Sequence, residues 1–221
     1  MLYSGPEPVV TIILTSPIAS NPSDESAISS TQPDQAPSVT YTIHKPLICA
    51  RSPFFSAAFN GTFTEGLNQS ITFTDISSIH FGIFNSWLYF HKILTPTKNY
   101  KGGCDILQLG HLWLLGQRFM APEFQNAVMD KIVSGWNEQP SAKNLHMFML
   151  LGYEGEDGSE MLRKVGIYQL SSMGREWMTQ VLGGEMVLAW RDMAFELDLK
   201  RCRPSEDFYV REDVFGANSA F

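Results

Sequence analysis

Residues 41–91 constrain the fold more than any other part of the chain, because they predict five secondary-structure elements with almost no residues between them. Tyr41 and Ile43 alternate with threonines, the pattern of a half-buried strand. Pro46 then suits the first turn of a helix, where a missing N–H costs nothing. Ser52 is a typical N-cap for a second short helix. This succession of strand and helices predicts a small α+β unit.

The second half of this stretch continues the pattern. The second helix has an apolar side made of Phe54, Phe55, Ala58 and Phe59. We expect it to end at Gly61, since glycine accepts the left-handed backbone that a helix C-terminus often needs. Residues 62–69 are predicted to form a loop, followed by a strand in which Ile71 and Phe73 alternate with threonines. A third helix is predicted after Ser77 and Ser78, with a core face made of Ile83, Phe84, Trp87, Leu88 and His91.

The order and spacing of these segments resemble the core of a BTB/POZ domain, in the divergent form common in fungal proteins. The segments that carry the resemblance are His44-Lys45, Leu47-Ile48, Ser52-Pro53-Phe54-Phe55, Phe63-Thr64-Glu65, Ile71-Thr72-Phe73 with Asp75, and Trp87-Leu88-Tyr89. Farther on, Leu112 to Arg118 and Phe124-Gln125-Asn126 resemble the paired helices that close such a domain. The resemblance implies an α+β fold with helices clustered around a small sheet. It also implies an interaction module and not an enzyme.

Changes in composition predict how the chain is organised. The predicted regions are a first strand region at 1–15, a disordered Ser/Pro-rich insertion at 16–38, a BTB/POZ core at 39–138, a helical extension at 139–203 and a flexible tail at 204–221. The insertion has too few apolar residues to offset the entropy of ordering it. Because the family usually makes this connection short, the pairing of the first strand, residues 9–14, stays open. An exposed edge on that strand would invite aggregation.

Charge and cysteine content limit the partners and the compartment. The net charge is -7, and no segment has the basic excess that binding to nucleic acid requires. No apolar run approaches the roughly 20 residues of a membrane helix. The start lacks a positive n-region, because the first basic residue is Lys45, so we expect no secretory signal. Cys49, Cys104 and Cys202 are odd in number, which favours reduced thiols in the cytoplasm or nucleus.

Residues that could carry out chemistry form no recognisable constellation in the sequence. The five histidines show no HxxxH or HExxH spacing, so we expect no metal and no cofactor. Cys49 lies in an apolar helix, and Cys104 has no histidine nearby in the chain, so neither is predicted to be a nucleophile. A hydrolase would rest only on scattered Ser, His and Asp residues. The sequence therefore predicts a protein that is not an enzyme.

The resemblance points to Phe63 and Glu65 as residues that bind a partner. In BTB proteins that recruit a cullin scaffold, this position carries an apolar residue, any residue and an acid. Phe63 would insert into a cullin pocket, and Glu65 would stabilise the loop or contact a cullin donor at the rim. The alternative is purely structural, with the phenylalanine covering the end of the core and the glutamate beginning a turn.

Self-association is a second expectation that the resemblance supports. An isologous two-fold contact would use Val10, Ile12, Leu47 and Ile48. Alternatively, these residues complete the core of a monomer. The hypothesis is thus a homodimeric adaptor that links an unidentified target protein to a cullin-based ubiquitin ligase. The competing hypothesis is an oligomerisation module in regulatory complexes, such as transcriptional ones, with no ligase role.

Overall fold

The computed structural model of the 221-residue chain describes residues 7–15, 38–94, 105–135, 142–154 and 160–172. The described strands are β1 (Val9–Thr15), β2 (Ser38–His44) and β3 (Ser70–Phe73). The described helices are α1 (Lys45–Arg51), α2 (Pro53–Asn60), α3 (Thr64–Asn68), α4 (Ser78–Phe90), α5 (Ile106–Arg118), α6 (Pro122–Gly135), α7 (Ala142–Glu154) and α8 (Glu160–Ser172). The predicted α+β class is confirmed.

The three strands form one mixed sheet in the order β2-β1-β3. β1 pairs antiparallel with β2 and parallel with β3. Its alternate side chains Val10, Ile12 and Leu14 are buried, as the period of two requires. The predicted strand at 9–14 is therefore present, and its pairing, which the sequence left open, is with β2 and β3. β1 is the central strand and has partners on both sides.

Several helix predictions are confirmed, and the capping of α2 explains one of them. The Ser52 hydroxyl accepts a hydrogen bond from the Phe55 N–H and donates one to the Phe119 carbonyl. This buried serine therefore caps α2 and also ties it to the turn after α5. The core face predicted for α4 is buried except for His91, which is exposed and ends the helix with a left-handed backbone at φ 52°.

Two local predictions around residue 61 are wrong. Gly61 does end α2, but its backbone is extended at φ -79° and not left-handed. The glycine is needed for space, because a Cβ there would lie 2.8 Å from the Ala57 carbonyl oxygen. The predicted loop at 62–69 contains the short helix α3, and the left-handed residue is Gln69 at the end of that helix, at φ 51°.

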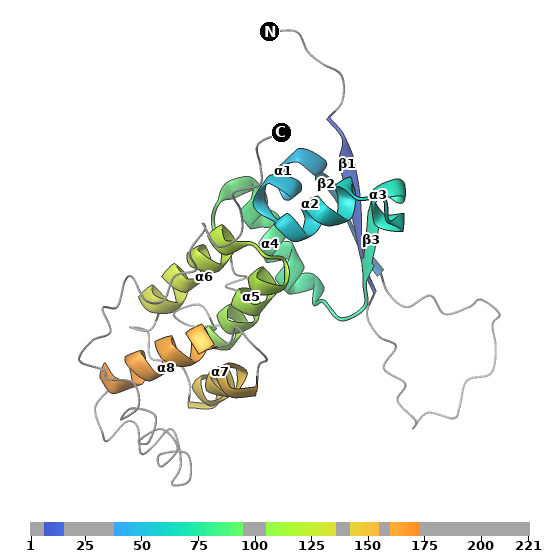
Figure 1. Cartoon of the computed structure of the whole chain (residues 1–221). Coiled ribbons are helices and arrows are strands. Elements are labelled where there is room, and N and C mark those ends of the chain that lie inside the picture. The colour runs from blue at the N-terminus through green and yellow to red at the C-terminus, as the bar shows by residue number, and fades with distance from the viewer. Residues whose placement is uncertain (1–6, 16–37, 95–104, 136–141, 155–159, 173–221) are drawn as a thin grey trace, which may run out of the picture.

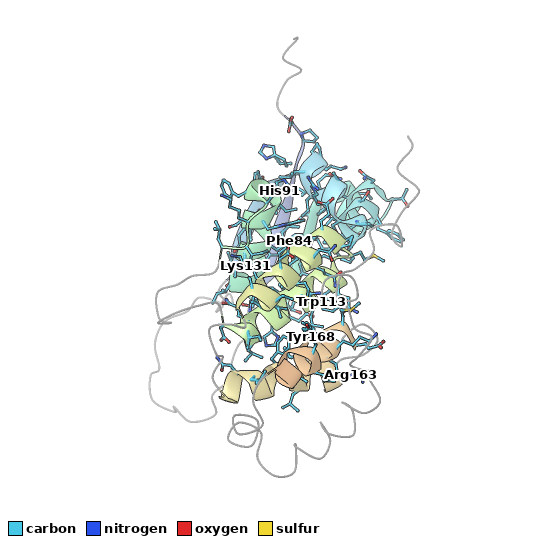
Figure 2. All side chains as sticks on the ribbon, turned by 90° about the vertical axis from the view of Figure 1, so that its left-hand side faces the viewer. Phe84, His91, Trp113, Lys131, Arg163 and Tyr168 are labelled. Atoms are coloured by element: carbon cyan, nitrogen blue, oxygen red, sulfur yellow. The ribbon has the colours of Figure 1, made fainter. Side chains whose placement is uncertain are left out.

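Phenylalanines from α2, β3, α4, α6 and the turn before α6 meet in one aromatic cluster. Its members are Phe54, Phe55, Phe59, Phe73, Phe81, Phe84, Phe119 and Phe124, with Trp87 beside them. Phe84 lies in the middle of the packed side chains in Figure 2. The cluster joins α2, β3, α4 and the turn before α6, so it holds together the part of the chain that carries α3.

The C-terminal helices pack against the rest of the domain on the side away from the sheet. Figure 1 shows α7 and α8 below α5 and α6, whereas α3 stands on the opposite side, beside β3. Gly110 of α5 lets the two layers approach, since a Cβ there would lie 2.9 Å from the Phe148 ring of α7. Leu145 and Phe148 of α7 and Leu162 and Val165 of α8 are buried.

Other predictions fall outside the described residues. The predicted insertion at 16–38 is described only at Ser38, which begins β2, and the tail at 204–221 is not described. The part of the extension at 139–203 that follows Ser172 also lies outside. The predicted boundary between the core and the extension, near residue 138, falls within an undescribed gap at 136–141. These boundaries stay predictions.

Candidate protein-binding surface

The short helix α3 carries two large apolar side chains in solvent. Phe63, its N-cap residue, is 72% exposed, and Leu67 is 77% exposed. The Leu67 N–H donates to the Phe63 carbonyl at 3.0 Å, so the two residues lie one helical turn apart. No large hydrophobic residue in the described part of the chain is more exposed than these two. Adjacent exposed apolar side chains of this size are typical of a protein-binding surface.

Hydrogen bonds from Gln69 hold α3 in place. Its side-chain amide donates to the Phe59 carbonyl of α2 at 3.0 Å and also to the Gly66 carbonyl. Its backbone N–H donates to the Glu65 carbonyl, and its own carbonyl accepts from the Thr11 N–H of β1 at 2.9 Å. Gln69 therefore connects α3 to both α2 and the central strand.

Close backbone contact supplies the rest of the support. Gly66 of α3 lies against Gly61, so that a Cβ at position 66 would overlap the Gly61 carbonyl oxygen. The same Cβ would lie 3.3 Å from the Ala58 carbonyl oxygen. Because backbone atoms cannot turn aside as a flexible side chain can, only glycine fits here. The helix is thus seated on the end of α2, with Phe63 and Leu67 projecting from it.

The predicted site residues fall into two groups. Phe63 and Glu65 lie together on α3, where Phe63 is exposed and Glu65 is half-buried. Val10, Ile12 and Ile48 are fully buried in the core of the same chain, and Leu47 is half-buried against it. The structure therefore does not bring the four predicted dimer residues together on an exposed surface.

Leu67 was not among the predicted partner-binding residues. Leu67 was missed because residues 62–69 were predicted to form a loop. Two side chains four residues apart lie on the same face only if the segment is a helix. The sequence signal was the acid and leucine in TEGLN, which is compatible with one helical turn. Five residues are too few for periodicity to reveal a helix.

A hollow of about 210 Å³ lies between the start of α4 and α5. The His80 and His111 rings lie nearly parallel there, with their centroids 5.5 Å apart. At its edge, Arg118 makes two hydrogen bonds to the Asp75 carboxylate, of 2.6 and 3.1 Å. This pair of bonds holds the pKa of Asp75 below its usual range.

Neutral imidazoles are favoured in this hollow. Burial lowers the pKa of His80, and the nearby His111 lowers it further. Burial also lowers the pKa of His111, although the Asp105 carboxylate opposes the change.

The lowered histidine pKa values predict a loss of stability in mild acid. Below about pH 6.5, His80 and His111 take up protons more readily in the unfolded chain than in the folded protein. The stability that these two neutral imidazoles contribute is therefore fully present above that pH and decreases as the pH falls below it. We expect the melting temperature to decrease between about pH 7.5 and 5.5. The His80→Gln/His111→Gln variant should show a smaller decrease. Equal slopes for both proteins in melting curves would contradict this origin of the effect.

Other functional classes find no support in the described residues. No group of three or more His, Cys, Asp or Glu side chains there is arranged to hold a metal ion. Cys49 is half-buried, burial raises the pKa of its thiol above the usual value, and Lys45 only partly offsets this. Cys104 and Cys202 lie outside the described part. None of the helices described is both long and apolar enough to span a membrane.

Comparison with known proteins agrees with this architecture. Residues 35–121 match the BTB/POZ domain family model. The match covers β2, the helices from α1 to α5, β3 and the site on α3, and it leaves out β1, α6, α7 and α8. The search of curated proteins found no match. The mixed three-stranded sheet with its helices is consistent with an α+β BTB fold.

Proposed function

On the premise that residues 35–121 form a BTB/POZ domain, which is a protein–protein interaction module, we propose that the protein is an adaptor for a cullin-based ubiquitin ligase. Phe63 would enter an apolar pocket on the cullin, and another surface of the adaptor would bind the target protein. The observation that carries the proposal is the 72% exposure of Phe63 on a helix that is tied to α2 and β1.

The physical argument concerns the energy of a single aromatic anchor. Large aromatic residues dominate binding when a partner pocket removes them fully from water. Phe63 gains most from such burial because little of its side chain is covered in the free protein. Since Gln69 already orders α3, little conformational entropy has to be lost on binding.

Calorimetric titration of the full chain with a cullin N-terminal domain tests the proposal. We expect micromolar or tighter binding by the wild type and a loss of about 30-fold or more in the Phe63→Ala variant. Phe90→Ala is the matched control, because Phe90 is an aromatic residue that is 64% exposed at the end of α4. It should bind like the wild type. A folded wild type that does not bind would reject the adaptor function.

Self-association in regulatory complexes is the second candidate, and the sheet supports it. β2 is an edge strand in the described sheet, and its sequence SVTYTIH has no Lys, Arg, Asp, Glu or Pro to protect it. Such an edge favours pairing with another strand, for example one from a second copy. Of the four predicted dimer residues, only Leu47 retains exposed surface. Sedimentation velocity of the full chain tests self-association. A dimer or larger species is expected, and a single monomeric species would show that this candidate is wrong.

A further inference from the structure

We propose that β2 pairs antiparallel with β2 of a second copy of the chain, with the two-fold axis at Thr40. The contact rests on the second candidate function, self-association, and gives that function a surface and a strand register. It uses none of the four residues predicted for a dimer contact, since three of them are fully buried in the core and Leu47 lies in α1. It is also separate from the exposed side chains of α3.

Hydrogen bonds of the sheet fix which way the backbone of β2 points. The Lys45 N–H donates to the Pro8 carbonyl at 2.8 Å, and these two residues continue the register of β2 and β1 by one pair. In an antiparallel ladder, only every second pair exchanges hydrogen bonds. The odd-numbered residues of β2 therefore direct their N–H and C=O groups toward β1. The even-numbered residues direct theirs away from it, to the edge of the sheet.

Tyr89 closes one end of this edge. The outward N–H of His44 donates to the Tyr89 hydroxyl at 3.3 Å, and Nδ1 of the same histidine lies 2.9 Å from that oxygen. In the part of the chain that the structure describes, no strand lies beyond β2, and no group bonds the outward backbone of Ser38, Thr40 or Thr42. The open edge is thus the stretch 38–42.

One register pairs the whole of this open edge with a second copy. With the axis at Thr40, that residue stands opposite its own copy and Ser38 stands opposite Thr42, so the outward groups of all three are bonded. An axis at Tyr41 would place Ser38 opposite His44, whose N–H is already bonded within the chain. Axes farther along the strand leave more of the edge unpaired. The register at Thr40 is therefore favoured, because unpaired backbone groups are costly once they are covered.

The side chains of the strand suit the same register. Thr40 would face Thr40, and Ser38 would face Thr42, on the exposed face of the sheet. On the other face, Val39, which is 42% exposed, would cover the half-buried Tyr41 of the second copy. Cross-strand pairs of hydroxyl residues, and of aromatic with β-branched residues, stabilise a sheet. No like charges meet, because the strand SVTYTIH contains no Lys, Arg, Asp or Glu.

Sedimentation velocity of the full chain over a range of concentrations tests the contact. We expect the wild type to dimerise reversibly. Thr40→Pro removes the outward N–H but no hydrogen bond to β1, so it should weaken the dimer about tenfold or more. Thr40→Lys should have a similar effect at low salt, because each ammonium would meet its own copy across the axis. Thr72→Lys is the matched control, since Thr72 is an exposed threonine on β3, the other edge strand. It should leave the dimer unchanged.

Mixing two charged variants tests the position of the axis. Thr40→Glu should also dimerise poorly by itself, because two carboxylates would meet. An equimolar mixture of Thr40→Lys and Thr40→Glu should restore the dimer, since opposite charges then face each other. A residue that lies away from the axis would face a different residue of the second copy, and the mixture would then give no rescue.

The outcomes separate this contact from the functions proposed above. A dimer that persists in Thr40→Pro and Thr40→Lys, with the circular dichroism and melting of the wild type, would overturn the β2 contact and keep self-association. Weakening in both variants without rescue in the mixture would overturn the axis at Thr40. A monomeric wild type would overturn self-association and the β2 contact together. Binding to the cullin N-terminal domain is measured separately, so the adaptor function does not depend on these results.

Discussion

Replacing Phe119 with alanine should lower the free energy of unfolding by about 3–5 kcal/mol, a large part of the stability of a domain of this size. The Phe119 side chain is fully buried in the turn between α5 and α6. Its ring centroid lies within 4.7–6.0 Å of those of Phe54, Phe55, Phe73, Phe81 and Phe84. The substitution would leave a cavity between α2, β3 and α4. The surrounding rings can move only partly into this cavity.

Urea unfolding followed by circular dichroism measures this effect. The control is Phe90→Ala, which removes the same aromatic ring from a position that is mostly exposed, and we expect a change within about 0.5 kcal/mol. A destabilisation of Phe119→Ala by less than about 1 kcal/mol would contradict the packing described for the aromatic cluster.

The second large effect is expected for Gly66→Ala, which should cost about 3 kcal/mol and also weaken partner binding. The new Cβ would overlap the Gly61 carbonyl oxygen, and the Ala58 carbonyl oxygen blocks movement on the other side. The backbone has to shift to relieve this overlap, because both obstructing atoms are carbonyl oxygens. At an overpacked site surrounded by side chains, a change of rotamer can relieve part of the overlap. α3 would move off the end of α2 and carry Phe63 and Leu67 with it.

Two measurements on Gly66→Ala separate stability from binding. Urea unfolding gives the cost of the strain, and titration with the cullin N-terminal domain below the unfolding transition shows whether α3 is displaced. Asn68→Ala, an exposed change on the same helix, should alter the stability by no more than about 0.5 kcal/mol. Unchanged stability in Gly66→Ala would mean that the contact between Gly61 and Gly66 is looser than described.

Much of the fold could be predicted from residues 41–91, because several strong local signals agree there. Ser52 before Pro53 marked the start of α2, and its side chain does cap that helix. The alternation of Ile71 and Phe73 with threonines marked β3, although the structure limits this strand to four residues. These predictions agree with the structure because the cap and the alternation depend only on residues within a few positions of each other in the chain.

The candidate site was predictable in part. Phe63 was singled out through the BTB resemblance, and the structure places its side chain in solvent. Leu67 was missed because a five-residue helix leaves no periodic pattern, and its existence depends on support from Gln69 and Gly61. Val10, Ile12 and Ile48 were predicted for a dimer contact, but apolar residues of a core and of an interface look the same in a sequence.

By itself, the sequence determined the local periods, the helix starts and the α+β class, since these follow from the backbone preferences and spacing of neighbouring residues. Only the tertiary structure decided that β1 is the central strand, that Gly61 and Gly66 meet, and that Phe63 and Leu67 share an outer side. Each of these depends on which distant segments pack together. Strand order and burial are set by contacts across the whole domain, and a linear pattern of apolar residues does not specify their partners.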